Sequence, residues 1–278
     1  MEVQTPRWGP WAVLLLAGAS MLSARAEPAH GFPAAVGESF RDCPDCPEMV
    51  VIPPARFLMG SPAGEKGRFA NEGPQHEVVL PHAIAISKYP VTMGDLRRWQ
   101  PGRSPALNDD SPAIMVTWVE ASAYTAWLSK AVDHAYHLPT EAEYEYAERA
   151  GTTTRYYWGD AIGVGNANCF GCGSDWDSKG ASPAGSFPPN GFGLYDMTGN
   201  VFEWVEDCYV ESEEGAPSDA TIARESPTTD CPMRVLRGSS SYNLPSFLRS
   251  AYRFRELPAS KSARRSFRLV REPDQPAT

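Results

Sequence analysis

The sequence predicts a single α+β domain with little regular secondary structure and many long loops. Its 278 residues include 26 prolines and 23 glycines, a composition typical of many turns and long connections. Helix-start signals occur only between residues 92 and 151, and residues 152–270 predict turns, short strands and loops. Because neither a tandem repeat nor a clear linker interrupts residues 48–271, one compact domain is expected.

Strands are expected in the first part of the domain. Short apolar runs at residues 49–53 and 56–60 predict two strands. An alternating, β-branched run at residues 76–87 predicts a third, half-buried strand. The polar residues 61–75 are expected to form the loop before it.

Three threonines mark the starts of three helices. Thr92, Thr117 and Thr140 each precede an acidic residue by three positions, a spacing at which the two side chains cap free backbone N–H groups. The acidic partners are Asp95, Glu120 and Glu143. Helix 118–132 is expected to turn these residues toward the core: Val119, Ala123, Ala126, Trp127 and Leu128. Helix 141–150 is expected to end at Gly151, a common C-terminal cap.

The N-terminus predicts an export signal. An apolar run at residues 11–22 ends in Ser23-Ala24-Arg25-Ala26, whose small residues match a cleavage site before Glu27. The run is shorter than the ~20 residues of a membrane span, although a retained anchor is the alternative. We therefore expect a signal peptide at 1–26, a Pro/Gly-rich, poorly ordered leader at 27–47, the domain at 48–271 and a tail at 272–278. A periplasmic or secreted location follows.

The charge balance argues against a nucleic-acid partner. Lys and Arg number 25 and Asp and Glu 34, which gives a formal net charge of −9. Nucleic-acid binding requires a basic surface that neutralises phosphates. The charge does not select among other classes of substrate.

All six cysteines lie after the expected signal peptide. An even number of cysteines in an exported chain predicts disulfides. They are Cys43, Cys46, Cys169, Cys172, Cys208 and Cys231. A zinc site built from the two C-x-x-C pairs is one alternative, but the gap between the pairs far exceeds zinc-ribbon spacing. A thioredoxin-like site is another, but its motif belongs at a helix N-terminus. Two local disulfides plus a Cys208–Cys231 link are favoured, although spacing does not fix the pairing.

The segment 191–204 combines two acids with three glycines and four aromatics. Asp196 and Glu203 lie seven residues apart, with Gly199 and Asn200 between them. Hard cations such as calcium bind carboxylate and carbonyl oxygens, so the segment is consistent with a turn around a cation. A glycine-rich turn between two core strands, with both acids solvated, is the alternative.

An ordered series of motifs across residues 48–271 resembles the formylglycine-generating enzyme family, also called sulfatase-modifying factors. The motifs are Met49-Val-Val-Ile-Pro, Phe57-Leu-Met-Gly-Ser61, Pro74-Gln-His-Glu-Val78, Tyr89-Pro-Val-Thr92, Leu138-Pro-Thr-Glu-Ala-Glu-Tyr-Glu-Tyr-Ala147, the segment 191–204, Arg234-Val-Leu-Arg-Gly238 and Ser266-Phe-Arg268. The resemblance implies a single α+β domain related to C-type lectins, with little regular secondary structure.

The resemblance also implies two calcium sites that hold loops together. The first site carries over to Asp196, Gly199, Val201 and Glu203. In the family this site uses two side chains and two backbone carbonyls, and it usually has Asn where this chain has Asp196. The second site carries over to Asn168 and the carbonyl of Cys169, with Asp177 as an acidic ligand.

The family's activity depends on copper held by two cysteine thiolates shortly after the Arg-Val-x-x-Gly motif. Here residues 238–249 contain no cysteine, and Asn243 lies about where the first is expected. The second position falls on Pro245 or Leu248. Because soft thiolates select Cu(I), neither an amide nor an apolar side chain replaces them. We therefore do not expect copper or the family's standard activity.

A groove for an extended peptide is implied at the same place. Its expected lining is Ser240, Tyr242, Asn243, Arg249 and Arg253. Arg249 and Arg253 either clamp a carboxylate or sulfate of the ligand or pair with acids of the chain itself. Among the histidines, a His134–His137 metal pair lacks a third ligand in the sequence, and His76 and His82 are expected to be structural.

Two functions from different classes follow. The first is an exported, atypical oxidoreductase-type maturation factor for a peptide-like substrate. Some relatives without the cysteine pair take part in periplasmic maturation, such as oxidation of a pyoverdine precursor. The alternative is a non-catalytic, calcium-stabilised module that binds a peptide, glycan or protein partner. A redox-capable group in the groove favours the first function, and Tyr242 with nearby aromatic residues is the candidate.

Overall fold

A computed structural model describes residues 1–2, 29, 31–104, 106–226 and 230–274. The expected signal peptide at 1–26 lies outside the described residues, apart from its first two positions. In the described part of the chain, no helix combines the length and apolarity needed to cross a membrane.

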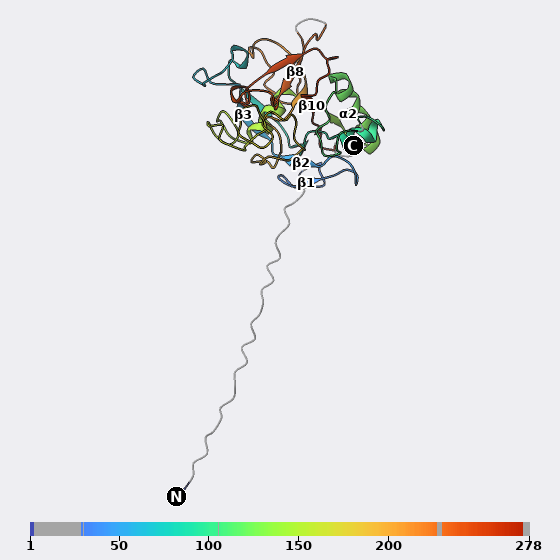
Figure 1. Cartoon of the computed structure of the whole chain (residues 1–278), viewed down its shortest axis with the longest axis vertical. Coiled ribbons are helices and arrows are strands. Elements are labelled where there is room, and N and C mark those ends of the chain that lie inside the picture. The colour runs from blue at the N-terminus through green and yellow to red at the C-terminus, as the bar shows by residue number, and fades with distance from the viewer. Residues whose placement is uncertain (3–28, 30, 105, 227–229, 275–278) are drawn as a thin grey trace.

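Within the described residues, the β structure consists of two sheets and a hairpin, several of whose strands are labelled in Figure 1. The first sheet has the order β1 (Ser39–Phe40), β2 (Met49–Ile52), β5 (Ile84–Ser87), β11 (Val270–Arg271) and β6 (Tyr136–His137), with antiparallel neighbours. The second has the order β10 (Arg265–Phe267), β7 (Phe202–Cys208), β8 (Arg234–Arg237) and β9 (Phe254–Glu256), and only its β10–β7 pair is parallel. Strands β3 (Ala55–Met59) and β4 (His76–Leu80) form the hairpin.

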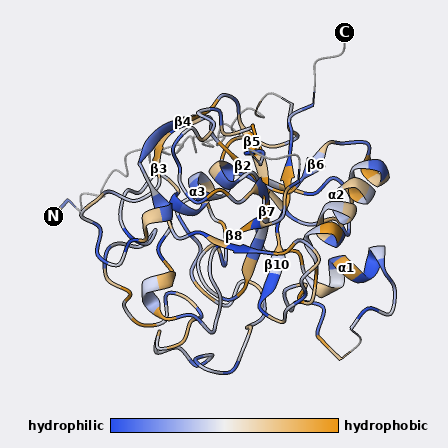
Figure 2. Ribbon diagram, turned by 90° about the horizontal axis from the view of Figure 1, so that it is seen from above, coloured by the Kyte–Doolittle hydropathy of each residue, from blue (hydrophilic) through white to orange (hydrophobic). Residues whose placement is uncertain are grey.

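Three α-helices begin at the three threonines. They are α1 (Met93–Trp99), α2 (Trp118–Val132) and α3 (Glu141–Arg149). Each has a complete capping box, in which the threonine and the acid three positions later accept each other's backbone N–H groups. Figure 2 shows α1 and α2 beside each other at one side of the sheets, while α3 packs against β3, β7 and β8. Short 3-10 turns occupy Ala70–Glu72 and Pro245–Phe247.

The run at residues 76–87 forms two strands in different sheets instead of one. Strand β4 pairs with β3, and β5 pairs with β2 and β11. Pro81 interrupts the run, because proline lacks the backbone N–H that a continuing strand needs for its ladder.

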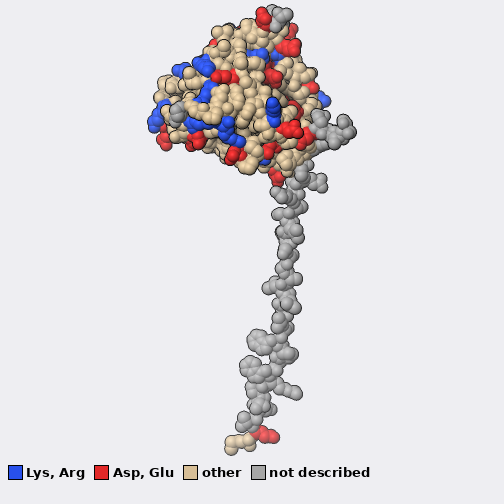
Figure 3. All heavy atoms as spheres, turned by 90° about the vertical axis from the view of Figure 1, so that its right-hand side faces the viewer, with Lys and Arg blue, Asp and Glu red and all other residues tan. Residues whose placement is uncertain are grey.

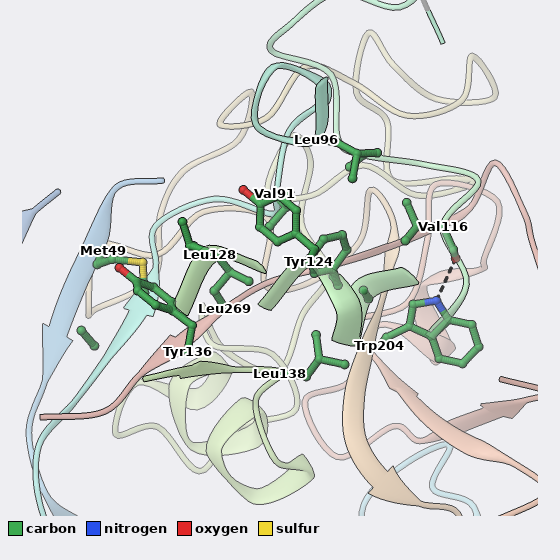
Figure 4. Packing of buried hydrophobic residues seen from close by; sticks show 14 of the residues in the cluster. Met49, Val91, Leu96, Val116, Tyr124, Leu128, Tyr136, Leu138, Trp204 and Leu269 are labelled. Atoms are coloured by element: carbon green, nitrogen blue, oxygen red, sulfur yellow. Dashed lines mark hydrogen bonds between the residues drawn. The ribbon is translucent and has the colours of Figure 1, made fainter. Parts of the chain in front are cut away.

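Helix α2 buries Leu128 as expected, but the rest of its buried face differs from the expected one. The buried side chains are Ala121, Tyr124, Thr125 and Leu128. Val119 is 57% exposed, and Ala123 and Ala126 are exposed as well. The spacing 121, 124, 125, 128 is the regular helical stripe, with a tyrosine and a threonine at its centre. In Figure 4 Tyr124 points into the core. In the same view, the indole nitrogen of Trp204 donates a hydrogen bond to the Val116 carbonyl at 3.0 Å.

The described part of the leader belongs to the folded domain. Strand β1 pairs with β2, and Phe32 and Ala34 are buried in the same core cluster as Met49. Burial of these apolar side chains supplies the favourable free energy that orders a Pro/Gly-rich segment.

Acidic and basic side chains are interspersed on the face drawn in Figure 3. The excess of acidic side chains, a net charge of −9, therefore does not form a single negative patch on that face. Exposed pairs of opposite sign occur on the surface, such as Arg56 with Glu77 at 2.8 Å.

Candidate functional site

Two cavities beside the second sheet share the side chain of Phe254 on β9. The larger has a volume of about 430 Å³ and is lined by Phe69, Ala70, Asn71, Tyr209, Glu211, Phe247, Tyr252, Arg253, Phe254 and Arg255. The smaller has a volume of about 210 Å³ and is lined by Phe202, Asn243, Phe254, Ser262, Arg264 and Arg265. We call the two cavities together the aromatic groove.

Aromatic rings that pack against one another form the walls of this groove. Phe202 stacks on Phe254 with 5.2 Å between ring centroids. Phe69 stacks on Phe247 at 5.7 Å, and Tyr252 meets Phe247 edge-on at 5.3 Å. Phe69 remains 40% exposed and Phe254 37% exposed. The groove therefore presents ring surfaces, already fixed by packing, that suit an apolar or aromatic side chain of a ligand.

Asn243 contributes a polar group to the smaller cavity. Its Oδ1 accepts a hydrogen bond from Ser240 Oγ at 2.6 Å, and its backbone carbonyl accepts one from the Phe170 N–H at 2.9 Å. Its Nδ2 has no hydrogen-bond partner in the described part of the chain. The fixed amide can therefore donate a hydrogen bond to a ligand in the cavity.

Arg264 lines the same cavity, and Tyr242 packs against Arg264. The ring of Tyr242 is 48% exposed, and the guanidinium of Arg264 lies 4.0 Å from its centroid, a cation–π arrangement. The neighbouring Arg265 pairs with Glu256. Arg264, by contrast, has no carboxylate within 4.0 Å among the described residues. Its positive charge is thus available to a ligand.

Arg249 and Arg253 are buried and are paired with carboxylates of the chain itself. Arg249 lies 2.6 Å from Glu72 and 2.9 Å from Glu65. Arg253 donates from Nε and Nη2 to the two oxygens of Glu141 at 2.6 and 2.7 Å. Of the two alternatives for these arginines, the structure supports pairing within the chain. They hold the loops around the groove together and do not form a free clamp.

Of the residues that line the groove, only Asn243 and Arg253 were expected there from the sequence, and Phe202, Phe254 and Arg264 are among those that were missed. Phe202 belongs to the segment 191–204. Arg264 lies two residues before the Ser266-Phe-Arg268 motif. Proximity to these motifs is the signal that could have found them. Phe254 carries no such signal, because it reaches the cavity only through the pairing of β9 with β8.

Of the residues expected at the first calcium site, Asp196, Gly199 and Val201 lie in a buried turn before β7, and Glu203 lies in β7 itself. Asp196 has φ +54°, and its Oδ2 accepts from the Gly185 N–H at 2.7 Å. Burial raises the pKa of Asp196 to about 6. Both oxygens of buried Glu203 accept from Arg268, at 2.6 and 2.9 Å. A carboxylate offers about four lone-pair sites, so these bonds leave acceptor capacity, and the oxygen donors fit calcium.

The two expected calcium segments lie against each other. The Asn200 N–H donates to the Asn168 carbonyl at 2.9 Å, and the Val201 N–H donates to the Gly199 carbonyl at 2.9 Å. Asn168 is fully buried, and its Oδ1 has no hydrogen-bond partner in the described part of the chain. A buried oxygen without a donor raises the free energy of the folded state. This orphaned oxygen therefore fits a ligand of a hard cation.

Asp177 is engaged with its own loop, which the Cys169–Cys172 disulfide closes. Its carboxylate accepts from the Gly171 N–H at 2.9 Å and from the Gly173 N–H at 3.2 Å. These backbone hydrogen bonds lower the pKa of Asp177. The carboxylate of Asp177 thus already has backbone donors within this loop.

All six cysteines lie in the described part of the chain and form disulfides. The pairs are Cys43–Cys46, Cys169–Cys172 and Cys208–Cys231. This confirms the favoured interpretation of the cysteines. Because every cysteine is paired, none remains for a thiolate zinc site or a thioredoxin-like thiol.

Comparison with known families gives a match over most of the chain. Residues 35–273 match the sulfatase-modifying factor enzyme 1-like domain. The chain is 32% identical over 252 residues to the serine/threonine-protein kinase pkn1 of Chlamydia caviae, a match that covers 81% of this chain. It spans only 38% of that kinase. It is 31% identical to the inactive C-alpha-formylglycine-generating enzyme 2 of Mus musculus, with coverage of 70% of this chain and 74% of the relative.

Among solved structures, PvdO from Pseudomonas aeruginosa is similar over the whole domain. The two chains are 37% identical and superpose with a TM-score of 0.78. The match covers 85% of this chain and 98% of PvdO. The likeness confirms a single α+β domain of the C-type-lectin-related type, with few helices, mixed sheets and many loops.

Proposed function

The chain belongs to the formylglycine-generating enzyme (sulfatase-modifying factor) family, and we propose that it is an exported maturation factor for a peptide-like substrate. In this proposal the substrate binds in the aromatic groove and undergoes an oxidoreductase-type change. The change is not the copper-dependent conversion of cysteine to formylglycine. The observation that carries the proposal is the cavity at Asn243, whose lining is aromatic, amide and arginine.

The groove supports binding of a peptide that carries an aromatic side chain and a carboxylate. The stacked rings of Phe202 and Phe254 offer a flat apolar surface. The free Nδ2 of Asn243 suits a peptide carbonyl, and the unpaired guanidinium of Arg264 suits a carboxylate. An apolar surface with a few fixed polar groups is the usual composition of a ligand site.

The chemistry of the side chains argues against Cu(I) at this place. All six cysteines are in disulfides, and no cysteine follows Cys231 in the sequence. The amide of Asn243 is a hard donor, whereas Cu(I) prefers soft sulfur ligands. We therefore propose that the standard activity of the family is absent.

A non-catalytic binding module is the second candidate. The lining of the aromatic groove contains neither a histidine nor a cysteine. Tyr242 is the redox-capable group beside the smaller cavity, and its ring is covered on one face by Arg264. The relative from Mus musculus is itself named inactive. These observations favour binding without turnover of the ligand.

We also propose that the protein binds structural calcium and is located in an oxidising compartment. The orphaned Oδ1 of Asn168 and the acids Asp196 and Glu203 supply oxygen donors for structural calcium ions. Three disulfides are typical of exported proteins, and this supports a periplasmic or secreted location.

The test is a binding assay with short synthetic peptides followed by mass spectrometry. Peptides that end in phenylalanine or tyrosine with a free carboxylate are compared with matched peptides that end in alanine or in a carboxamide. We expect Phe254→Ala and Arg264→Gln to weaken binding of the aromatic acids by about tenfold, or about 1.4 kcal/mol each. Leu58→Ala is the matched control, because Leu58 is 55% exposed on β3, outside the groove.

Equal affinity of the wild type and both groove variants for all peptides would reject the groove as the binding site. Loss of two hydrogens from a bound peptide, in the presence of oxygen, distinguishes the maturation factor from the binding module. If the peptides bind but keep their mass, the second candidate replaces the first.

A further inference from the structure

A histidine and two glutamates converge where the first sheet meets α3, outside the aromatic groove. His137 ends β6, Glu143 lies in the first turn of α3, and Glu272 directly follows β11. One nitrogen of His137 and one carboxylate oxygen from each glutamate all lie within 4.8 Å of one another. Glu272 is 135 residues from His137 in the sequence, and the antiparallel pairing of β11 with β6 brings the two together, whereas Glu143 follows His137 by six residues.

The hydrogen bonds of His137 direct one ring nitrogen toward this cluster. Nδ1 lies 2.7 Å from the carbonyl of Leu138, an acceptor, so Nδ1 carries a proton. Nε2 donates to Oε1 of Glu272 at 2.9 Å, and a cation held between the two side chains would take the place of this proton. A histidine that donates from one nitrogen to a carbonyl and offers the other to a ligand is the usual arrangement at metal sites.

Glu143 supplies an independent sign of a missing ligand. It is fully buried, and its Oε2 accepts from the Thr140 N–H at 2.8 Å in the capping box of α3. Its Oε1 has no hydrogen-bond partner in the part of the chain that the structure describes. A buried, unpartnered carboxylate oxygen is costly, and the carboxylate that carries it belongs to the cluster with His137 and Glu272.

His82 completes the cluster on its solvent side. Its Nε2 lies 3.0 Å from Oε2 of Glu272, so this glutamate contacts both histidines. The side chain of His82 is 43% exposed and that of Glu272 is 27% exposed. An ion therefore has a route from solvent, and the cluster has an open side.

We propose that His137, Glu143 and Glu272 bind one divalent zinc-class cation, with His82 or a water molecule as the fourth ligand. Imidazole nitrogen and carboxylate oxygen are zinc ligands at about 2.0–2.2 Å, and four ligands is its usual number. The nitrogen donor separates this site from calcium, which takes oxygen ligands. The bound cation joins β6, α3 and the segment after β11, and an exchangeable fourth position would face solvent.

The proposal is tested by titrating zinc chloride into the mature protein and measuring the heat of binding. Excess calcium in the buffer keeps oxygen-only sites filled, and the disulfides leave no thiol to compete. We expect one zinc ion per chain, and a loss of affinity of at least about tenfold in both His137→Ala and Glu143→Gln. Glutamine preserves the capping box at this position. His76→Ala is the control, because His76 lies on β4 outside the cluster, and its affinity should equal that of the wild type.

No zinc binding by the wild type would overturn the proposal, and so would equal affinity in all four proteins. If a variant fails to fold, cobalt(II) added to the wild type decides the question. We expect the visible absorption of a four-coordinate cobalt ion that zinc displaces, and absence of that absorption rejects the site. The proposal does not depend on the groove, so peptide binding and zinc binding succeed or fail separately.

Discussion

Arg268 and Glu203 form a two-point ion pair that solvent does not reach. Arg268 Nε lies 2.6 Å from one carboxylate oxygen of Glu203, and Nη2 lies 2.9 Å from the other. Arg268 also donates to the carbonyls of Ser87 and Tyr195, both at 3.0 Å. The guanidinium thereby links β5, the turn before β7 and β7 itself. Burial raises the pKa of Glu203 and the charge of Arg268 opposes that rise.

We expect Arg268→Met to lower the free energy of unfolding by about 3–5 kcal/mol, because it leaves Glu203 buried without its counter-charge. Urea unfolding measures the effect. In chelator, where no calcium ion depends on Glu203, the double variant Arg268→Met/Glu203→Leu should recover much of the loss. Arg56→Met is the control, since the Arg56–Glu77 pair is 68% and 60% exposed and should contribute under about 1 kcal/mol. Equal losses from the buried and exposed pairs would contradict the expectation.

The glycine at position 199, in the turn before β7, is predicted to tolerate no side chain. Gly199 has φ +85°, and a Cβ there would lie 2.6 Å from the Asn168 carbonyl oxygen. Gly151 has nearly the same φ, +86°, but its Cβ would meet nothing within 4 Å. Gly151→Ala should therefore cost only about 1 kcal/mol of backbone strain, whereas Gly199→Ala should cost clearly more or prevent folding. Thermal melting compares the two variants, and similar midpoints would show that the close approach to Asn168 is unimportant.

Stability at low pH should depend on Glu120, the acid of the α2 capping box. Burial would raise the pKa of Glu120, but hydrogen bonds from the Thr117 N–H, Arg103 and Lys261 outweigh it and lower the pKa to about 2, from 4.5. A lowered carboxylate pKa stabilises the folded state fully above pH 4.5, and this stabilisation is lost as the pH falls toward 2. Glu120→Gln lacks this contribution.

The measurement is the unfolding free energy of the wild type and Glu120→Gln across this pH range. The difference between the two proteins should be largest above pH 4.5 and should shrink toward pH 2. A difference that stays constant over the range would mean that the hydrogen bonds of Glu120 do not favour its charged form.

Removal of calcium should destabilise the domain, if the oxygen donors of Asn168, Asp196 and Glu203 hold it. An ion that binds only the native state raises the melting temperature. We expect a lower midpoint in chelator than in calcium chloride, and a smaller difference in Asn168→Ala. An unchanged midpoint in tightly chelated buffer would reject structural calcium.

The helix starts and the cysteines could be predicted from local sequence. A threonine three positions before an acid is a short-range signal, and all three helices begin there, including the one whose acid is Asp95. The buried face of α2 could not be predicted in the same way. Tyr124 and Thr125 are partly polar, and the packing of Trp99 and Phe267 against Tyr124 selects that face.

For the candidate sites too, contacts between residues that are close in sequence could be predicted, and contacts between distant residues could not. The residues of the 191–204 turn are close in sequence and do meet in space, so their proximity was predictable. The pairing of Arg249 with Glu72 joins positions 177 residues apart, and no local pattern indicates it. The His137–Glu272 contact spans 135 residues and exists only because β11 lies beside β6.

The most direct test of the central claim is an assay for formylglycine itself. The mature protein is incubated with a cysteine-containing sulfatase-motif peptide, copper and oxygen, and the peptide is examined by mass spectrometry. We expect the cysteine to remain unchanged, because the groove offers the amide of Asn243 and aromatic rings, with no thiolate for Cu(I). Conversion of the cysteine to formylglycine, at a rate that Asn243→Ala abolishes, would contradict this claim.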